Sequence, residues 1–159
     1  MNNKNKIKMV LFDIDGVFTD GTILISEDGQ ESKRVSFKDI DAFFALKKAG
    51  FKTGFITGET TPLTQWFNNR FAPDYFVFGC KDKGTAIQEI LTKENLSAQE
   101  ACFIGDSKHD ISAFHQVGFK ICPRNAVKEI HEICDIVLQN SGGDGAVAEL
   151  ADILVRMLN

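Results

Sequence analysis

Two carboxylates lie two residues apart at the end of an apolar run near the N-terminus, in the stretch LFDIDGVFTDG. Asp13 and Asp15 are separated by one isoleucine and followed by Gly16. Taken alone, this pattern is more typical of a turn, or of a fragment of a calcium loop, than of a catalytic site. An EF-hand loop is excluded, because it needs Asp or Asn at its fifth position and Gly at its sixth, where this chain has Val17 and Phe18.

Three other polar clusters follow apolar runs further along the chain. They are Thr57 with Gly58 in FITG, Lys81 and Lys83 in KDK, and Asp106 and Asp110 in GDSKHD. In open parallel sheets ligands bind at the carboxyl ends of the strands, so we expect these groups to meet Asp13 and Asp15 at one edge. Close carboxylates stay ionised beside a hard cation such as Mg2+, while a hydroxyl, an N–H and an ammonium suit a phosphoryl group. The combination predicts phosphoryl transfer.

Each cluster taken alone also has an ordinary structural explanation. FITG is consistent with a strand and a turn, and GDSKHD with a helix start capped by Asp106 or Ser107. Lys83 alone could be a surface lysine, and Lys81 competes with it for any role. Only the order of the clusters and their shared position at strand ends favour the joint interpretation.

The elements that must position these groups alternate between short apolar runs and helical patterns. Strands are expected at residues 8–14, 51–57, 75–78, 101–106, 119–122 and 135–138, and helices at 38–48, 62–71, 82–93, 108–118, 125–134 and 145–158. Strand, helix, strand at this spacing predicts an α/β fold, a three-layer Rossmann-like parallel sheet with helices on both faces.

One segment breaks this alternation. Residues 22–37 form two β-rich runs around the turn pair Asp28 and Gly29, which predicts a β-hairpin flap beside the end of the first strand. A length of 159 residues fits one domain, residues 1–159, with a flexible end at 1–7 and a glycine-rich loop and C-terminal helix at 141–159. The hairpin, helices and strands expected between Asp13 and Thr57 (residues 14–56) and between Thr57 and Lys83 (residues 58–82) account for both segments. Neither segment therefore has room for a cap domain.

Composition excludes several classes of protein. A net charge of −4 and a pI near 5.4, with scattered basic residues, disfavour nucleic-acid binding. No apolar run approaches the roughly 20 residues of a membrane span, and the first residues lack the apolar core of a signal peptide. The four cysteines form no C-x-x-C pair, which argues against a zinc or thioredoxin-type site and favours reduced core residues in the cytoplasm.

The four clusters, in this order, resemble the motifs of the haloacid dehalogenase (HAD) superfamily phosphatases. The resemblance implies that Asp13 is the nucleophile that forms an aspartyl-phosphate and that Asp15 is the general acid and base. It also implies that Thr57, the N–H of Gly58 and Lys83 bind the transferring phosphoryl oxygens. Mg2+ would be held by the Asp13 carboxylate, the Asp15 backbone carbonyl and the Asp106 carboxylate, while Asp110 would act from behind these ligands or through a water. Asp15 favours hydrolysis of a phosphate ester, since relatives that keep the aspartyl-phosphate carry Thr there.

Among capless members, the chain is similar to the 3-deoxy-D-manno-octulosonate 8-phosphate (KDO 8-phosphate) phosphatase group and the nine-carbon ulosonate 9-phosphate phosphatases. DGVFTDG, the hairpin with DGQESKRVSF, and GGDGAVAEL carry this resemblance. It implies a small acidic sugar phosphate as substrate, in lipopolysaccharide or sialic acid metabolism, and a homotetramer. Gly142, Gly143 and Gly145 would reach the site of a neighbouring subunit, or would merely lead into the last helix.

Three positions depart from the group's pattern. KDIDAFFAL stands where the group has Asp-Gly-x-Gly, which alters the start of the first helix. Glu59 follows ITG where the octulosonate enzymes have an arginine that would bind a carboxylate, whereas the nine-carbon enzymes tend to carry Glu. Glu59 would accept hydroxyl hydrogens or pair with Arg70, and both are candidates for substrate specificity. Ala148 replaces the arginine of the usual GAVRE.

Two other classes of protein remain as alternatives. One is a catalytically idle HAD-like module that regulates a cytidylyltransferase partner, although a binding-only domain has no need of Asp15. The other is a receiver domain phosphorylated on aspartate, which shares the acidic pocket and the sheet. Its phosphoaccepting residue would lie at a later strand end, and a hairpin after DIDG has no place in that fold.

Overall fold

The computed structural model describes residues 7–158, and the α/β fold expected from the sequence is confirmed. Six parallel strands form one sheet in the order β5-β4-β1-β6-β7-β8. The strands are β1 (Met9–Phe12), β4 (Lys52–Ile56), β5 (Tyr75–Val77), β6 (Ala101–Ile104), β7 (Phe119–Cys122) and β8 (Ile136–Val137). Because β1 lies between β4 and β6, the first strand occupies the middle of the sheet.

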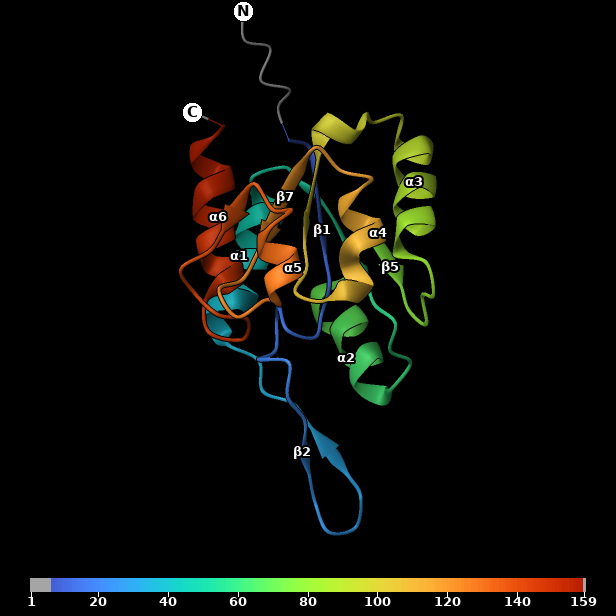
Figure 1. Cartoon of the computed structure of the whole chain (residues 1–159), viewed down its shortest axis with the longest axis vertical. Helices are drawn as coiled ribbons and strands as arrows, with labels where there is room; N and C mark the ends of the chain where they lie inside the picture. The colour runs from blue at the N-terminus through green and yellow to red at the C-terminus, as the bar shows by residue number, and fades with distance from the viewer. Residues whose placement is uncertain (1–6, 159) are drawn as a thin grey trace, which may run out of the picture.

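Helices cover both faces of this sheet. They are α1 (Phe37–Lys48), α2 (Pro62–Phe71), α3 (Lys83–Glu94), α4 (Ile111–Phe114), α5 (Lys128–His131) and α6 (Ala146–Arg156). Buried residues of α1, α2 and α6 pack on one face with Val10 and Phe12, and those of α3, α4 and α5 pack on the other with Met9 and Leu11. In Figure 1, α1 and α6 lie on one side of β1, and α3 and α4 on the other.

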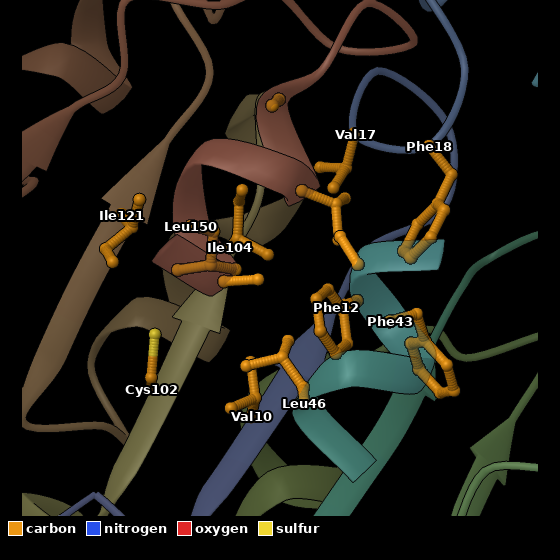
Figure 2. Packing of buried hydrophobic residues seen from close by; sticks show 14 of the residues in the cluster. Val10, Phe12, Val17, Phe18, Phe43, Leu46, Cys102, Ile104, Ile121 and Leu150 are labelled. Atoms are coloured by element: carbon orange, nitrogen blue, oxygen red, sulfur yellow. The ribbon is translucent and has the colours of Figure 1, made fainter. Parts of the chain in front are cut away.

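An aromatic cluster fills the first of these faces and anchors the loop after β1. Phe18, on that loop, has its ring centroid 5.5 Å from Phe12, 6.2 Å from Phe43 and 5.2 Å from Phe55 and Phe71. Figure 2 shows Phe18 pointing toward Phe12 of β1 and Phe43 of α1, with Val17 beside it on the same loop. The turn after the first strand is therefore held by the core.

The local boundaries differ from the expected ones where the sequence pattern was short. The helices expected at 108–118 and 125–134 are single turns, α4 and α5, and α4 follows a 3-10 turn at Lys108–Asp110. Residues that flank these turns, such as Val117 and Ala126, are also buried against the sheet, so both stretches pack without forming a longer regular helix. The flexible end expected at 1–7 lies outside the described residues except for Ile7, which is buried.

The expected hairpin is present but is paired over a short length. Its strands β2 (Leu24–Ile25) and β3 (Glu31–Ser32) are antiparallel, and Gly29 at the turn has a φ of 81°. In Figure 1 the hairpin projects away from the body of the molecule, beyond the end of β1. Within residues 7–158, this hairpin, α2 and β5 take up the segments in which a cap domain could have been inserted. No described helix has the length and apolar character needed to cross a membrane.

Candidate active site

A pocket of about 500 Å3 lies at the carboxyl ends of β1, β4 and β6. The residues that line it come from all four polar clusters of the sequence. They are Asp13, Asp15, Gly21, Thr57, Gly58, Glu59, Cys80, Lys81, Lys83, Asp106, Ser107 and His109. The parallel sheet thus brings the four clusters to one edge, as expected for an open α/β sheet.

A buried ion-pair network forms the floor of this pocket. Lys83, the first residue of α3, has its Nζ 2.9 Å from Asp13 Oδ1 and 2.6 Å from Asp110 Oδ1. Its side chain is 6% exposed, and Asp82 before it caps the helix by accepting from the N–H of Gly84. Burial disfavours the ammonium, but Asp13 and Asp110 outweigh burial and raise the pKa of Lys83 above its ordinary value. Lys83 is therefore a fixed cation.

Asp110 has both carboxylate oxygens occupied by protein donors. Oδ1 accepts from Lys83, and Oδ2 accepts from the backbone N–H groups of Asp106 (2.9 Å) and Ser107 (3.1 Å). Ser107, rather than Asp106, precedes the helical turn as its capping residue. The fully buried Asp110 therefore orients Lys83 and the loop that carries Asp106.

Three carboxylates offer oxygen atoms that lie within 4.8 Å of one another: Asp13, Asp106 and Asp110. Burial first, and then the charge of Asp110, raises the pKa of Asp13 to about 8 and that of Asp106 to about 7. The charged groups of the chain therefore do not supply enough positive charge to keep Asp13 and Asp106 ionised at their ordinary pKa values. Oxygen-only donors crowded in this way fit a hard divalent cation such as Mg2+.

Glycine at position 16 brings the backbone after Asp15 close to Asp106. A Cβ at Gly16 would lie 1.8 Å from Asp106 Oδ2, and the φ of Gly16 is 81°. No side chain could be accommodated in this approach. The peptide that joins Asp15 to Gly16 therefore borders the acidic cluster, as a backbone ligand would require.

Asp15 lines the pocket, and a lysine of the hairpin contacts its carboxylate. Lys33, the residue after β3, has its Nζ 2.7 Å from Asp15 Oδ1, and the Lys33 side chain is only 8% exposed. Thr19 Oγ1 donates to the same Oδ1 at 3.3 Å and accepts from the N–H groups of Gly16 and Gly21. The hairpin is thereby tied to the loop that carries both N-terminal acids.

Thr57 and Gly58 follow β4, the strand next to β1, and line the same pocket. The Thr57 hydroxyl accepts from the N–H of Glu59 at 3.2 Å, and the backbone of Thr57 is bonded to Val77 and Cys80. These bonds fix the turn, and the hydroxyl proton of Thr57 stays available for an acceptor in the pocket. The arrangement provides a hydroxyl donor in the same pocket as Asp13.

The two specificity candidates on this side lie apart. Glu59 lines the pocket, whereas Arg70 is an exposed residue near the end of α2 and does not line it. Among residues 7–158, no ion pair joins Arg70 to Glu59. Within one chain, Glu59 is the candidate that meets the pocket directly.

The glycine-rich loop before α6 packs against the turn after β1 of its own chain. The N–H of Gly143 donates to Val17 O at 3.0 Å, and a Cβ at Gly142 would lie 1.8 Å from Gly16 O. Asp39, in the altered start of α1, accepts from the N–H groups of Gly145 and Ala148 at 3.1 Å. This loop therefore supports the turn that follows Asp15.

Sequence reasoning missed several residues at the site. Thr19 and Lys33 contact Asp15, while Ser107 and His109 line the pocket. The expected position of the hairpin beside the first strand was the one available signal for Lys33. The alternation of side chains in so short a hairpin does not indicate which of them faces inward.

Comparisons with known proteins agree with this geometry. Residues 77–150 match the model of the haloacid dehalogenase-like hydrolases. A HAD superfamily (subfamily III A) hydrolase from Legionella pneumophila is 30% identical, with a TM-score of 0.91 over 97% of this chain and 85% of that one. The chain therefore belongs to the haloacid dehalogenase-like hydrolases.

Within this family, the chain resembles the KDO 8-phosphate phosphatases and is a phosphoric monoester hydrolase. The KDO 8-phosphate phosphatase of Haemophilus influenzae is 27% identical over 150 residues, which are 94% of this chain and 83% of the relative. That of Moraxella catarrhalis, solved with a magnesium ion, a phosphate ion and KDO, is 27% identical with a TM-score of 0.90, over 97% of this chain and 88% of that one.

Proposed function

We propose that this protein is a Mg2+-dependent phosphomonoesterase that acts through an aspartyl-phosphate at Asp13, with KDO 8-phosphate as the substrate. The observation that carries the proposal is the buried set of Asp13, Lys83 and Asp110, with Asp15 two residues beyond the nucleophile. This set supplies a nucleophile, a fixed cation and a separate acid at one edge of the sheet.

In the first half of the reaction, a carboxylate oxygen of Asp13 attacks the phosphorus atom. The bond from phosphorus to the sugar oxygen breaks, and that oxygen takes a proton from Asp15 as it leaves. Lys83, the hydroxyl of Thr57 and the N–H of Gly58 donate to the phosphoryl oxygens and stabilise their charge. The products of this step are the free sugar and the aspartyl-phosphate.

In the second half, Asp15 is ionised and takes a proton from a water molecule that attacks the same phosphorus. The bond between phosphorus and Asp13 breaks, which releases inorganic phosphate and restores both acids. Mg2+ would be held by the carboxylates of Asp13 and Asp106 and the carbonyl of Asp15, and when bound it supplies positive charge between nucleophile and phosphate. Asp110 keeps Lys83 and the loop of Asp106 in place.

The substrate class rests on the relatives that act on KDO 8-phosphate and on the open pocket without a cap. Glu59 favours a second candidate, a nine-carbon ulosonate 9-phosphate, since it puts a carboxylate where the octulosonate enzymes have arginine. In either case the expected assembly is a homotetramer in the cytoplasm, where Arg70 and the glycine loop could meet a neighbouring site. Association with a sugar cytidylyltransferase is part of the same proposal.

The test is a steady-state comparison of KDO 8-phosphate with KDN 9-phosphate and N-acetylneuraminate 9-phosphate, with Mg2+ and with EDTA. A kcat/KM for KDO 8-phosphate at least about 10-fold above the nine-carbon esters supports the octulosonate assignment. A preference in the opposite direction supports the nine-carbon assignment. Turnover of no phosphate ester across a broad panel, despite bound Mg2+, contradicts the enzyme and favours an idle regulatory module.

A further inference from the structure

Lys33 is a nearly buried cation whose one partner among the described residues is the catalytic acid. Its Nζ lies 2.7 Å from Asp15 Oδ1, whereas the Asp15 side chain is 31% exposed. The two residues are 18 positions apart in the chain, and the hairpin strands β2 and β3 lie between them. A long, flexible side chain loses rotamer entropy when it is held this way. The charge-assisted hydrogen bond to Asp15 has to offset that cost.

The two oxygens of Asp15 are in different surroundings. Oδ1 accepts from Lys33 and from the hydroxyl of Thr19, both on the side of the loop and hairpin. Oδ2 accepts no hydrogen bond from residues 7–158, while Asp15 lines the pocket. A carboxyl group rotates about its last bond unless one oxygen is held, so these contacts single out Oδ2 as the oxygen that meets the substrate.

We propose that Lys33 is a positioning residue for the proton-transfer step: it holds Oδ1 of Asp15 so that Oδ2 faces the leaving oxygen of the ester. The inference rests on the proposed function, since it takes Asp15 to be the general acid. The proton on Oδ2 moves to the leaving oxygen as the ester bond to phosphorus breaks, and Lys33 keeps its own protons throughout. The flap thus contributes to the proton-transfer step through Lys33.

The neighbouring residue offers a matched control. Arg34 lies on the same hairpin, is 73% exposed, and has its Nη2 3.8 Å from Asp20 Oδ2 rather than near Asp15. Arg34→Met removes one cation from the same segment without touching the acid. Lys33→Met removes the ammonium and keeps an apolar stem of similar length, so the two variants differ in whether Asp15 loses its partner.

The experiment measures kcat/KM for ring-substituted phenyl phosphates, whose leaving phenols differ in acidity but little in size. This constant covers the steps up to release of the phenol, so it reports the transfer from Asp15 without the later hydrolysis. A poorer leaving group depends more on acid catalysis, which contributes about 10^2 to 10^4-fold in rate. Lys33→Met should therefore lose about 3-fold with 4-nitrophenyl phosphate and about 30-fold or more with phenyl phosphate.

Arg34→Met should keep the wild-type dependence on leaving-group acidity. Equal losses of Lys33→Met on all esters, or no loss, would overturn the inference, because a purely structural or substrate-binding role does not depend on phenol acidity. If Lys33→Met does not fold, as judged by its thermal unfolding, Lys33→Gln carries the same test. Wild-type protein that hydrolyses none of the esters would contradict the proposed function itself, and with it this inference.

Discussion

The buried edge of the sheet and the projecting hairpin contribute to one pocket but are built in opposite ways. At the edge, Lys83 and Asp110 are enclosed, and both have their partners within the chain. The hairpin has two-residue strands and exposed apolar side chains, with Leu24 at 74% exposed, and Lys33 joins it to Asp15. The difference matches the proposed division of roles, in which the buried edge binds the phosphoryl group and the hairpin, through Lys33, positions Asp15.

The largest expected effect comes from removing the buried cation at the edge. Lys83→Met should lower kcat/KM by about 10^3-fold, because a donor to the phosphoryl group is lost and Asp110 is left unpaired. It should also lower the free energy of unfolding by about 3 kcal/mol, since one member of a buried ion pair is removed. Steady-state kinetics and urea unfolding measure the two effects.

Lys48→Met is the control for this change. Lys48 is an exposed residue at the end of α1, and its substitution should shift the free energy of unfolding by less than about 0.5 kcal/mol. Near wild-type activity of Lys83→Met would contradict the role assigned to the buried edge.

Each of the two regions contains a glycine, and substitution of these glycines by alanine compares the regions directly. Gly142→Ala would drive a Cβ against Gly16 O and displace the turn that carries both acids, so activity should fall by about 10-fold or more. Gly29→Ala has open space around its Cβ but a φ of 81°, which strains the hairpin tip by about 1 kcal/mol. Gly29→Ala should keep turnover of 4-nitrophenyl phosphate within about 2-fold, and equal losses in both variants would contradict the comparison.

Because of the acidic cluster, we expect the free energy of unfolding to depend on pH and on bound metal. The folded-state pKa values of Asp13 and Asp106 are raised to about 8 and about 7, so the folded protein without metal binds more protons than the unfolded chain. The contribution of these two groups to the free energy of unfolding is therefore greatest below about pH 4. This contribution is lost as the pH rises through 7 and 8. Mg2+ should oppose this loss.

Thermal unfolding in EDTA and in Mg2+ between pH 5 and pH 8 measures that effect. The melting temperature gained from Mg2+ should be at least about 5 °C larger at pH 8 than at pH 5. Asp106→Asn should reduce the gain, because it removes one of the two carboxylates. A gain that is equal at all pH values would argue against Asp13 and Asp106 as the metal site.

The smallest effect is expected on the exposed side of the hairpin. Leu24→Ser should change the free energy of unfolding of the single chain by less than about 0.5 kcal/mol, since its side chain is already in solvent. Phe18→Ala, in the buried cluster that anchors the turn after β1, should lower the free energy of unfolding by about 3 to 5 kcal/mol. Similar costs for the two variants would show that the hairpin packs more tightly than the structure indicates.

The same contrast explains how far the sequence alone could lead. The alternation of strands and helices in a parallel sheet, and the meeting of Asp13, Thr57, Lys83 and Asp106 at one edge, follow from apolar periodicity and from the rule for parallel sheets. Those signals are strong because the elements are buried, and burial leaves a pattern in the sequence.

Contacts that depend on a single long side chain leave no such pattern. Lys33 follows a ladder of only two residue pairs, which is too short to show in the sequence which side chains face inward. The contact of Asp39 with the start of α6 joins segments more than 100 positions apart. The one-turn lengths of α4 and α5 also leave no clear pattern, because short helices depend on tertiary packing more than on local propensity.

The most direct test of the account is to locate the covalent intermediate. Asp15→Asn should still be phosphorylated by 4-nitrophenyl phosphate, whose leaving group needs little acid, but should lose the phosphate slowly because no base activates water. Borohydride reduction of the trapped acyl phosphate followed by peptide mass spectrometry is predicted to find homoserine in place of Asp13. Release of phosphate with no modification at residue 13, or with the modification at another carboxylate, would contradict the assignment of Asp13 as the nucleophile.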